Sequence, residues 1–192
     1  MRSKNNAAKA IPSKKEDIIS QAYASFYEHG FHATGVDKAL GKSGLSKRTV
    51  YKYFRSKEEL VAATIKYYQQ ITFATVLHEC EKRAKTPLQK ILTIFDLKAE
   101  AIAKGDYSGC FAINAKIEYE GKDKGIEEAC AIFVSNLEGF ILSCCKEAKI
   151  KEPKSSARQI LILLEGAIVL GQAKRDAGVV KTAKDMAEKL LS

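Results

Sequence analysis

The segment SGLSKRTVYKYF occupies residues 43–54, and it decides the predicted fold. Gly44 is typical of a residue that ends a helix, and Ser46 is typical of a residue that begins one. A glycine favours a helix C-terminus, and a serine hydroxyl accepts an amide hydrogen of the first turn. Upstream, Thr34 and Asp37 have the spacing of a capping pair, which predicts a short preceding helix. Two short helices joined by a glycine turn form a helix-turn-helix.

The two predicted helices have an apolar inner side and a basic outer side. The residues predicted to pack inward are Val36, Leu40, Leu45, Val50 and Phe54. The side chains left outside are Lys47, Arg48, Thr49, Tyr51 and Lys52. Cations bind phosphates, a helix N-terminus binds an anionic oxygen, and hydroxyl groups bind base edges. This side therefore predicts an interface with double-stranded DNA.

The charge distribution agrees with a polyanionic partner. The formal net charge is +9, and residues 1–60 carry twelve Lys and Arg against six Asp and Glu. The basic excess is thus concentrated in the first third of the chain, which favours nucleic acid over a membrane. A basic surface that only aids solubility is the alternative that charge alone leaves open.

The remaining sequence predicts an all-α protein. With 46% hydrophobic and 29% charged residues, the composition is that of a globular protein, and apolar residues recur at helical spacing. We expect nine helices and three parts: a flexible basic arm over residues 1–13, a helix-turn-helix head over 14–60 and a helical body over 61–192. Outside the helix-turn-helix, helices are predicted near residues 14–30, 57–83, 87–104, 110–118, 125–148, 155–175 and 182–191.

Residues 14–60 resemble the DNA-binding signature of TetR-family transcriptional regulators. The resemblance lies in three segments with matching spacing, TGVD at 34–37, SGLSKRTVYKYF at 43–54 and SKEEL at 56–60. It implies a ligand-released repressor that binds a palindromic operator as a homodimer. The chain departs from the family pattern at Gly35, at Ala39 and at Gly41, which is expected inside the second helix.

The resemblance also implies roles for individual residues. Contacts with base edges or flanking phosphates are expected from Lys47, Arg48 and Thr49. Contacts with the DNA backbone are expected from Tyr51, Tyr53 and Lys57. Thr34 and Gly35 are expected to present amides to phosphate. Packing between helices is the alternative for Tyr53.

A second copy of the chain is the partner expected for the end of the body. Residues 160–171 are apolar around much of a helix and include small residues, and TetR-like proteins dimerise through their last long helices. The interface candidates are Ile160, Leu163, Leu164, Ala167, Leu170 and Gly171. A buried central helix of a monomer is the alternative.

The small-molecule effector expected from the resemblance would bind inside the body. Its predicted contacts are Phe95, Phe133 and Leu137, which ordinary core packing also explains. Cys110, Asn114 and Glu118 share one predicted helix face, and Gly109-Cys110 resembles a pattern found in one group of TetR relatives. A thiol at a helix start can sense oxidants or electrophiles, whereas a buried cysteine is a small hydrophobe.

Other classes of protein find little support. Three scattered histidines and five cysteines without a CxxC pair predict no metal site, and neither a cofactor loop nor a catalytic triad is present, so we expect no enzyme. The apolar stretch Ile160 to Ala173 is too short for a membrane span, and no apolar signal region begins the chain, which predicts a cytoplasmic protein. The rival functions are a constitutive architectural DNA-binding dimer and a redox protein that depends on Cys110.

Overall fold

The computed structural model describes residues 13–41, 45–105 and 107–192. Within these ranges the chain forms nine helices and no strand, which confirms the all-α prediction. The first helices form a small head: α1 (Lys14–His29), α2 (Val36–Ala39) and α3 (Lys47–Val50). The connecting helix is α4 (Lys57–Arg83), and the body continues with α5 (Pro87–Ala103), α6 (Phe111–Tyr119), α7 (Lys124–Glu147), α8 (Pro153–Lys174) and α9 (Ala177–Leu191).

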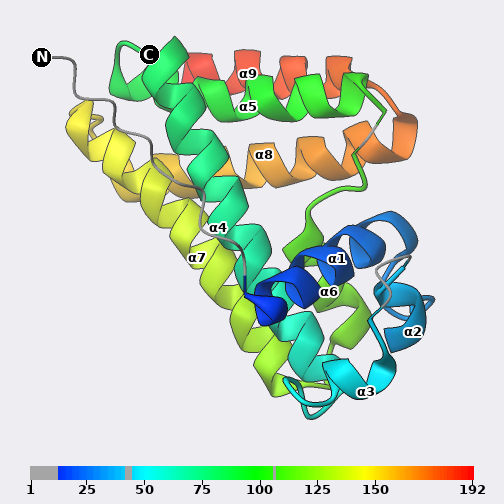
Figure 1. The fold of residues 1–192 in the computed structure, drawn as a ribbon. Helices are drawn as coiled ribbons and strands as arrows, with labels where there is room; N and C mark the ends of the chain where they lie inside the picture. Colours follow the sequence, from blue (N-terminus) through cyan, green and yellow to red (C-terminus); the bar gives the residue numbers. More distant parts are fainter. Residues whose placement is uncertain (1–12, 42–44, 106) are drawn as a thin grey trace, which may run out of the picture.

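One long helix joins the head to the body. Figure 1 shows α4 running from the head to the far end of the body, with α7 along its side. At that far end α5, α8 and α9 pack on one another, while the short α6 lies beside α1 in the head region. The helix α4 therefore contacts both α1 of the head and α7 of the body.

Side-chain caps explain why most helices begin where the sequence predicted. The hydroxyls of Ser46, Ser56 and Thr86 accept amide hydrogens three residues along, at the starts of α3, α4 and α5. Each such bond satisfies a backbone donor that has no partner inside its helix. Asp176 caps α9 in a similar way, so this helix begins five residues before the predicted Thr182.

The start of α2 differs from the prediction. Its N-cap residue is Gly35, without a side-chain hydrogen bond, whereas the Thr34 hydroxyl is buried and has no partner among the described residues. Gly41 lies beyond α2 and not inside it, with a φ of +54° that favours glycine. Gly44 and residues 1–12 of the predicted basic arm lie outside the described residues.

An aromatic core crosses the boundary between head and body. Phe31, in the loop after α1, packs on Phe111 of α6 with ring centroids 4.8 Å apart. Phe111 in turn packs on Tyr68 of α4 at 5.4 Å, and Tyr68 on Phe133 of α7 at 5.0 Å. All four residues are buried, so the head and body share one continuous core.

Two body helices have the length and composition of a membrane span, contrary to the estimate from sequence. They are α7 and α8, whose most apolar windows are 39% and 44% buried against other helices. Core helices of soluble proteins pass the same test of length and composition, so the observation is weak evidence for a membrane.

Candidate nucleic-acid interface and effector site

The helix-turn-helix holds its second helix by a cap and a small core. The Ser46 hydroxyl accepts from the Thr49 amide at 3.2 Å and contacts the Thr49 hydroxyl at 3.0 Å. Val50 and Phe54 are buried, as predicted, and anchor the segment from below. The helix itself ends at Val50, and residues 51–53 continue as turns bonded to its last carbonyls.

The outer side of α3 is basic, aromatic and accessible. Lys47 and Arg48 are exposed, and the side chains of Tyr51 and Tyr53 are 44% and 38% exposed. Lys47 lies 3.9 Å from Asp37 in an exposed pair, which contributes little stability. Within the part of the chain that the structure describes, Arg48 forms no ion pair.

Two of the three other predicted contacts have structural partners inside the chain. The Lys57 ammonium donates to the Phe31 carbonyl at 2.7 Å, so it ties the start of α4 to the loop after α1. The Thr34 amide donates to the same carbonyl at 3.4 Å and its side chain is buried, which argues against a phosphate contact. Gly35 is exposed at the start of α2.

A carboxylate of α6 binds the loop that follows α1. Glu118 accepts from the Phe31 amide at 3.2 Å and from the His32 amide at 2.8 Å. The His32 ring lies 2.8 Å from the Glu118 carbonyl and stacks on Tyr119. We call these contacts of Glu118 the head–body clamp. Glu118 was predicted as an effector contact, and in the structure it connects the two parts of the chain.

A model of bacterial regulatory proteins of the tetR family matches residues 18–64, which include α2, α3 and the start of α4. This segment of the chain belongs to the TetR family of DNA-binding domains. The regulator RutR from Escherichia coli K12 is 33% identical over 93 residues, which cover 48% of this chain and 43% of RutR. The chain therefore spans less than half of this curated relative. The fatty acid metabolism regulator protein of Bacillus subtilis is 23% identical over 72% of both chains.

Solved structures share the fold over nearly the whole chain. A TetR-family regulator from Streptomyces coelicolor superposes with a TM-score of 0.82 at 18% identity, covering 92% of this chain and 93% of that one. The reduced form of Escherichia coli NemR superposes with a TM-score of 0.81 at 16% identity, covering 91% and 95%. The TetR-family fold thus includes the body as well as the head.

Most of the predicted effector contacts are core residues. The side chains of Phe95, Phe133 and Leu137 are buried in the helical body, and none of them lines a cavity described below. The Asn114 amide donates to the Ser108 carbonyl at 2.7 Å and holds the loop before α6. Ordinary packing, the alternative reading of the aromatic residues, accounts for their positions.

Cys110 is buried and its thiol is held protonated. Burial raises the pKa of Cys110 to about 12, and the nearby Glu165 carboxyl adds to the increase. Only the thiolate reacts with electrophiles, so the environment works against the sensing role. All five cysteines are free and buried.

A cleft between α4 and α5 was not predicted from the sequence. It has a volume of about 380 Å³, and α1 contributes Tyr23 and Tyr27 to its wall. Lys98 of α5 and Tyr107 of the following loop lie on the same wall. The available signal was only a lysine between Leu97 and Ala99 on α5.

The predicted dimer face of α8 divides between the core and the surface. Ile160, Leu164, Ala167 and Gly171 are buried within the protomer, because this side of α8 packs against α7, α5 and α9. Burial in a single chain leaves no side-chain surface for a partner, which corrects the prediction at these four positions. Leu163 is half-buried and Leu170 is exposed.

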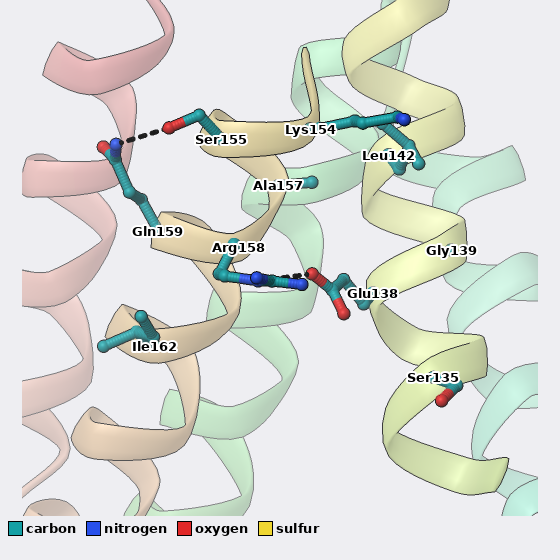
Figure 2. A pocket seen from close by; sticks show the side chains of 10 residues that line it. All are labelled: Ser135, Glu138, Gly139, Leu142, Lys154, Ser155, Ala157, Arg158, Gln159 and Ile162. Atoms are coloured by element: carbon teal, nitrogen blue, oxygen red, sulfur yellow. Dashed lines mark hydrogen bonds and ion pairs between the residues drawn. The ribbon is translucent and has the colours of Figure 1, made fainter. Parts of the chain in front are cut away.

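The open side of α8 carries other apolar residues. Ile162 and Val169 are 65% and 53% exposed, and Leu170 lies next to Val169. Figure 2 shows the adjoining groove between α7 and α8, with a volume of about 700 Å³, where Arg158 binds Glu138 at 3.1 Å. We call this surface of α7 and α8 the open face.

Replacing Glu118 with alanine is expected to loosen the head–body clamp. The amides of Phe31 and His32 lose their acceptor, so their hydrogen exchange should accelerate about tenfold, the effect of one or two lost hydrogen bonds. Hydrogen-exchange mass spectrometry of the peptide that contains both residues measures this. The control is Glu128→Ala, at an exposed position of α7. Equal exchange in both variants would contradict the clamp.

Cys110 of the native chain is expected to resist alkylation at pH 8. With the pKa raised to about 12 from 9.0, the thiolate share falls about a thousandfold. Iodoacetamide should therefore label Cys110 rapidly only after denaturation, as followed by peptide mass spectrometry. Labelling of the native thiol at the rate of a free cysteine would revive the redox alternative.

Proposed function

We propose that this chain is a dimeric transcriptional regulator that binds palindromic operator DNA through α3. It acts in the cytoplasm as a repressor, and a small molecule bound in the body releases it from the operator. The head covers residues 14–60 and the body 61–192, so the boundary falls inside α4. A continuous helix across the boundary suits a protein in which the body positions the head.

The observation that carries the proposal is the outer side of α3. Lys47, Arg48, Tyr51 and Tyr53 are exposed on a segment whose opposite side is buried. A cationic surface on a short helix of this kind enters the major groove and also contacts phosphates. Lys57 contributes indirectly, because it orients the loop that begins the helix-turn-helix.

The open face supports a homodimer. Ile162, Gly166 and Val169 recur at helical spacing on α8, and Gly139 lies on the facing part of α7. A Cβ added at either glycine would meet no atom within 4 Å, so a second helix can approach closely there. A two-fold pair of open faces would form a four-helix interface and place two heads on two half-sites.

Effector release is supported by the position of the cleft. Its wall includes Tyr23 and Tyr27 of α1 together with residues of α4 and α5, so a ligand there contacts both the head and the body. A ligand that prefers one relative position of these helices shifts the equilibrium toward it. In a dimer this shift changes the distance between the two heads.

Selection of duplexes from a random DNA pool tests DNA binding directly. We expect a palindrome with half-sites about one helical turn apart. Arg48→Ala should weaken binding to that duplex, because one cationic contact with the DNA is lost. The slope of the logarithm of the binding constant against the logarithm of the salt concentration should fall in magnitude by about one. Fluorescence anisotropy at several salt concentrations measures both.

The matched control for Arg48→Ala is Lys181→Ala, at an exposed position of α9 far from α3. It removes the same charge from the chain, so it should leave the slope unchanged. A pool without any enriched sequence would refute the proposed function, and an equal effect of both variants would refute the assignment of α3.

A lysine on the open face is expected to abolish dimerisation. Ile162→Lys and Val169→Lys place charges where two apolar faces would meet, and a buried unpaired charge is costly. The control, Ile117→Lys, alters an isoleucine of α6 that is 71% exposed. Analytical ultracentrifugation should give twice the chain mass for the native protein and the control, and the chain mass for the two variants. A native monomer, or dimeric variants, would contradict the interface.

A further inference from the structure

The cleft between α4 and α5 contains the ammonium group of Lys98. Lys98 lines the cleft and forms no ion pair or hydrogen bond with any described residue. Its ammonium lies 5.4 Å from the centroid of the Tyr107 ring. Burial lowers the pKa of Lys98, while Cys110 and Glu165 raise it. A charge withdrawn from water without a hydrogen-bonded counterion is unfavourable, so the site favours an anion.

A second unsatisfied donor lies on the same wall. The Tyr107 hydroxyl is buried and has no hydrogen-bond partner among the described residues. Buried hydroxyl groups nearly always have a partner, so an orphan hydroxyl of a residue that lines a cleft is available to a ligand. Lys98 and Tyr107 together can bind the two oxygens of one carboxylate, since an ammonium and a phenol are both donors.

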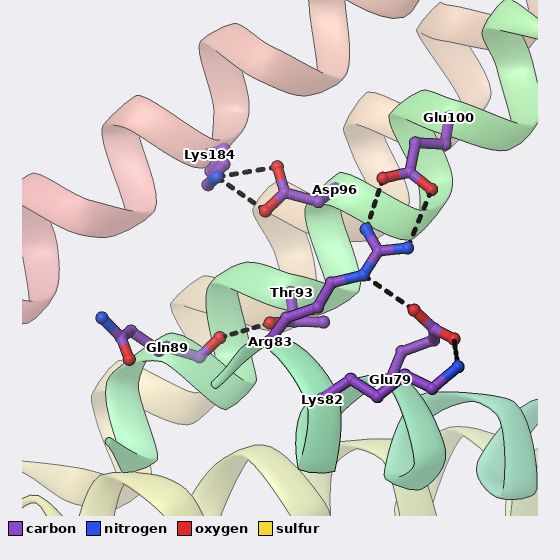
Figure 3. Close-up of polar contacts among 8 residues, drawn as sticks. All are labelled: Glu79, Lys82, Arg83, Gln89, Thr93, Asp96, Glu100 and Lys184. Carbon is purple, nitrogen blue, oxygen red and sulfur yellow. Dashed lines mark hydrogen bonds and ion pairs between the residues drawn. The ribbon is translucent and has the colours of Figure 1, made fainter. Parts of the chain in front are cut away.

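The carboxylates near the cleft do not oppose an anion. Arg83 binds Glu100 through both of its terminal nitrogens at the cleft mouth and compensates its charge (Figure 3). Glu165 does not line the cleft. Burial raises the pKa of Glu165, although Lys98 and Cys110 act in the other direction. The lining also includes Lys104, so the charge presented to a ligand is positive.

The rest of the wall suits a flat apolar body. Tyr23, Tyr27 and Tyr68 line the cleft, and Tyr23 and Tyr68 stack with ring centroids 6.0 Å apart. Aromatic walls favour aromatic ligands through stacked and edge contacts. The volume of about 380 Å³ holds about a dozen non-hydrogen atoms, at roughly 30 Å³ each as in liquid water.

We propose that the effector of this cleft is a compact aromatic monocarboxylate, whose carboxylate binds Lys98 and Tyr107 and whose ring lies among the tyrosines. The inference rests on the proposed function, because it names the class of molecule that acts on the regulator. It also makes Lys98 and Tyr107 the residues that determine specificity, in place of the core residues expected from sequence.

Three probes of the same shape and different charge test the proposal: naphthoate, naphthamide and naphthylmethylammonium. Isothermal titration calorimetry of the full chain should give an affinity for naphthoate at least about tenfold above that for naphthamide, because an anionic acceptor strengthens both hydrogen bonds. The cation should bind more weakly still. Decanoate, a flexible acid, should bind more weakly than naphthoate.

Lys98→Met removes the charge and keeps an unbranched side chain. It should lower the affinity for naphthoate about tenfold and that for naphthamide by a smaller factor, because a neutral amide oxygen accepts more weakly from an ammonium. Tyr107→Phe should lower the naphthoate affinity by a smaller factor, and it keeps the test valid should the first variant fold poorly. The matched control is Lys181→Met on α9, which should match the native chain.

Several outcomes would overturn the inference. They are no binding of naphthoate at millimolar concentration, equal binding of naphthamide, unchanged affinity in both cleft variants, or equal binding of decanoate. Measuring how tightly the same proteins bind the selected duplex separates the effector class from the proposed function. A chain that binds its duplex but not naphthoate refutes the effector class alone, and a chain that binds naphthoate but enriches no duplex refutes only the proposed function.

Discussion

Packing around Phe111 holds the head of the chain against its body. Its ring contacts Phe31 of the head at 4.8 Å and Tyr68 of α4 at 5.4 Å. Tyr23 and Tyr27 of α1 complete the group at 5.0 and 5.9 Å. Aromatic contacts of this kind add about 0.5–1.5 kcal/mol each to the effect of burial. The position of α3 therefore depends on a cluster that is built mostly from other helices.

The head–body clamp requires a defined orientation of the head relative to the body, in addition to this packing. Apolar contacts tolerate small rotations, whereas a carboxylate that accepts two neighbouring amides requires a defined orientation. Glu118 meets this requirement with the amides of Phe31 and His32, and Lys57 binds the Phe31 carbonyl from the other side. One loop is thus bound by α4 and α6 at once, so a movement of either helix reaches the helix-turn-helix.

The cleft and the aromatic cluster share residues. Tyr23, Tyr27 and Tyr68 line the cleft on one side and pack on Phe111 on the other. A ligand between α4 and α5 would press on the same rings that hold the head. In the proposed dimer, this shared wall would give a physical route from a bound effector to the spacing of two heads, without a separate transmission element.

Local signals were sufficient for the helices and for the outer side of α3. Caps such as Ser46 and Ser56 act over three residues, and the side of a short helix that faces outward follows from periodicity. On α8 periodicity failed, since apolar residues lie all around it, and packing alone placed Ile160 inside and Ile162 outside. The clamp joins Glu118 to two residues that lie 86 and 87 positions earlier in the sequence. The cleft is lined by residues of α1, α4 and α5. Sequence by itself determined the helices and the family, because those signals are local. Only the tertiary structure decided the open face, the clamp and the cleft, because each requires side chains that meet only after distant helices have packed.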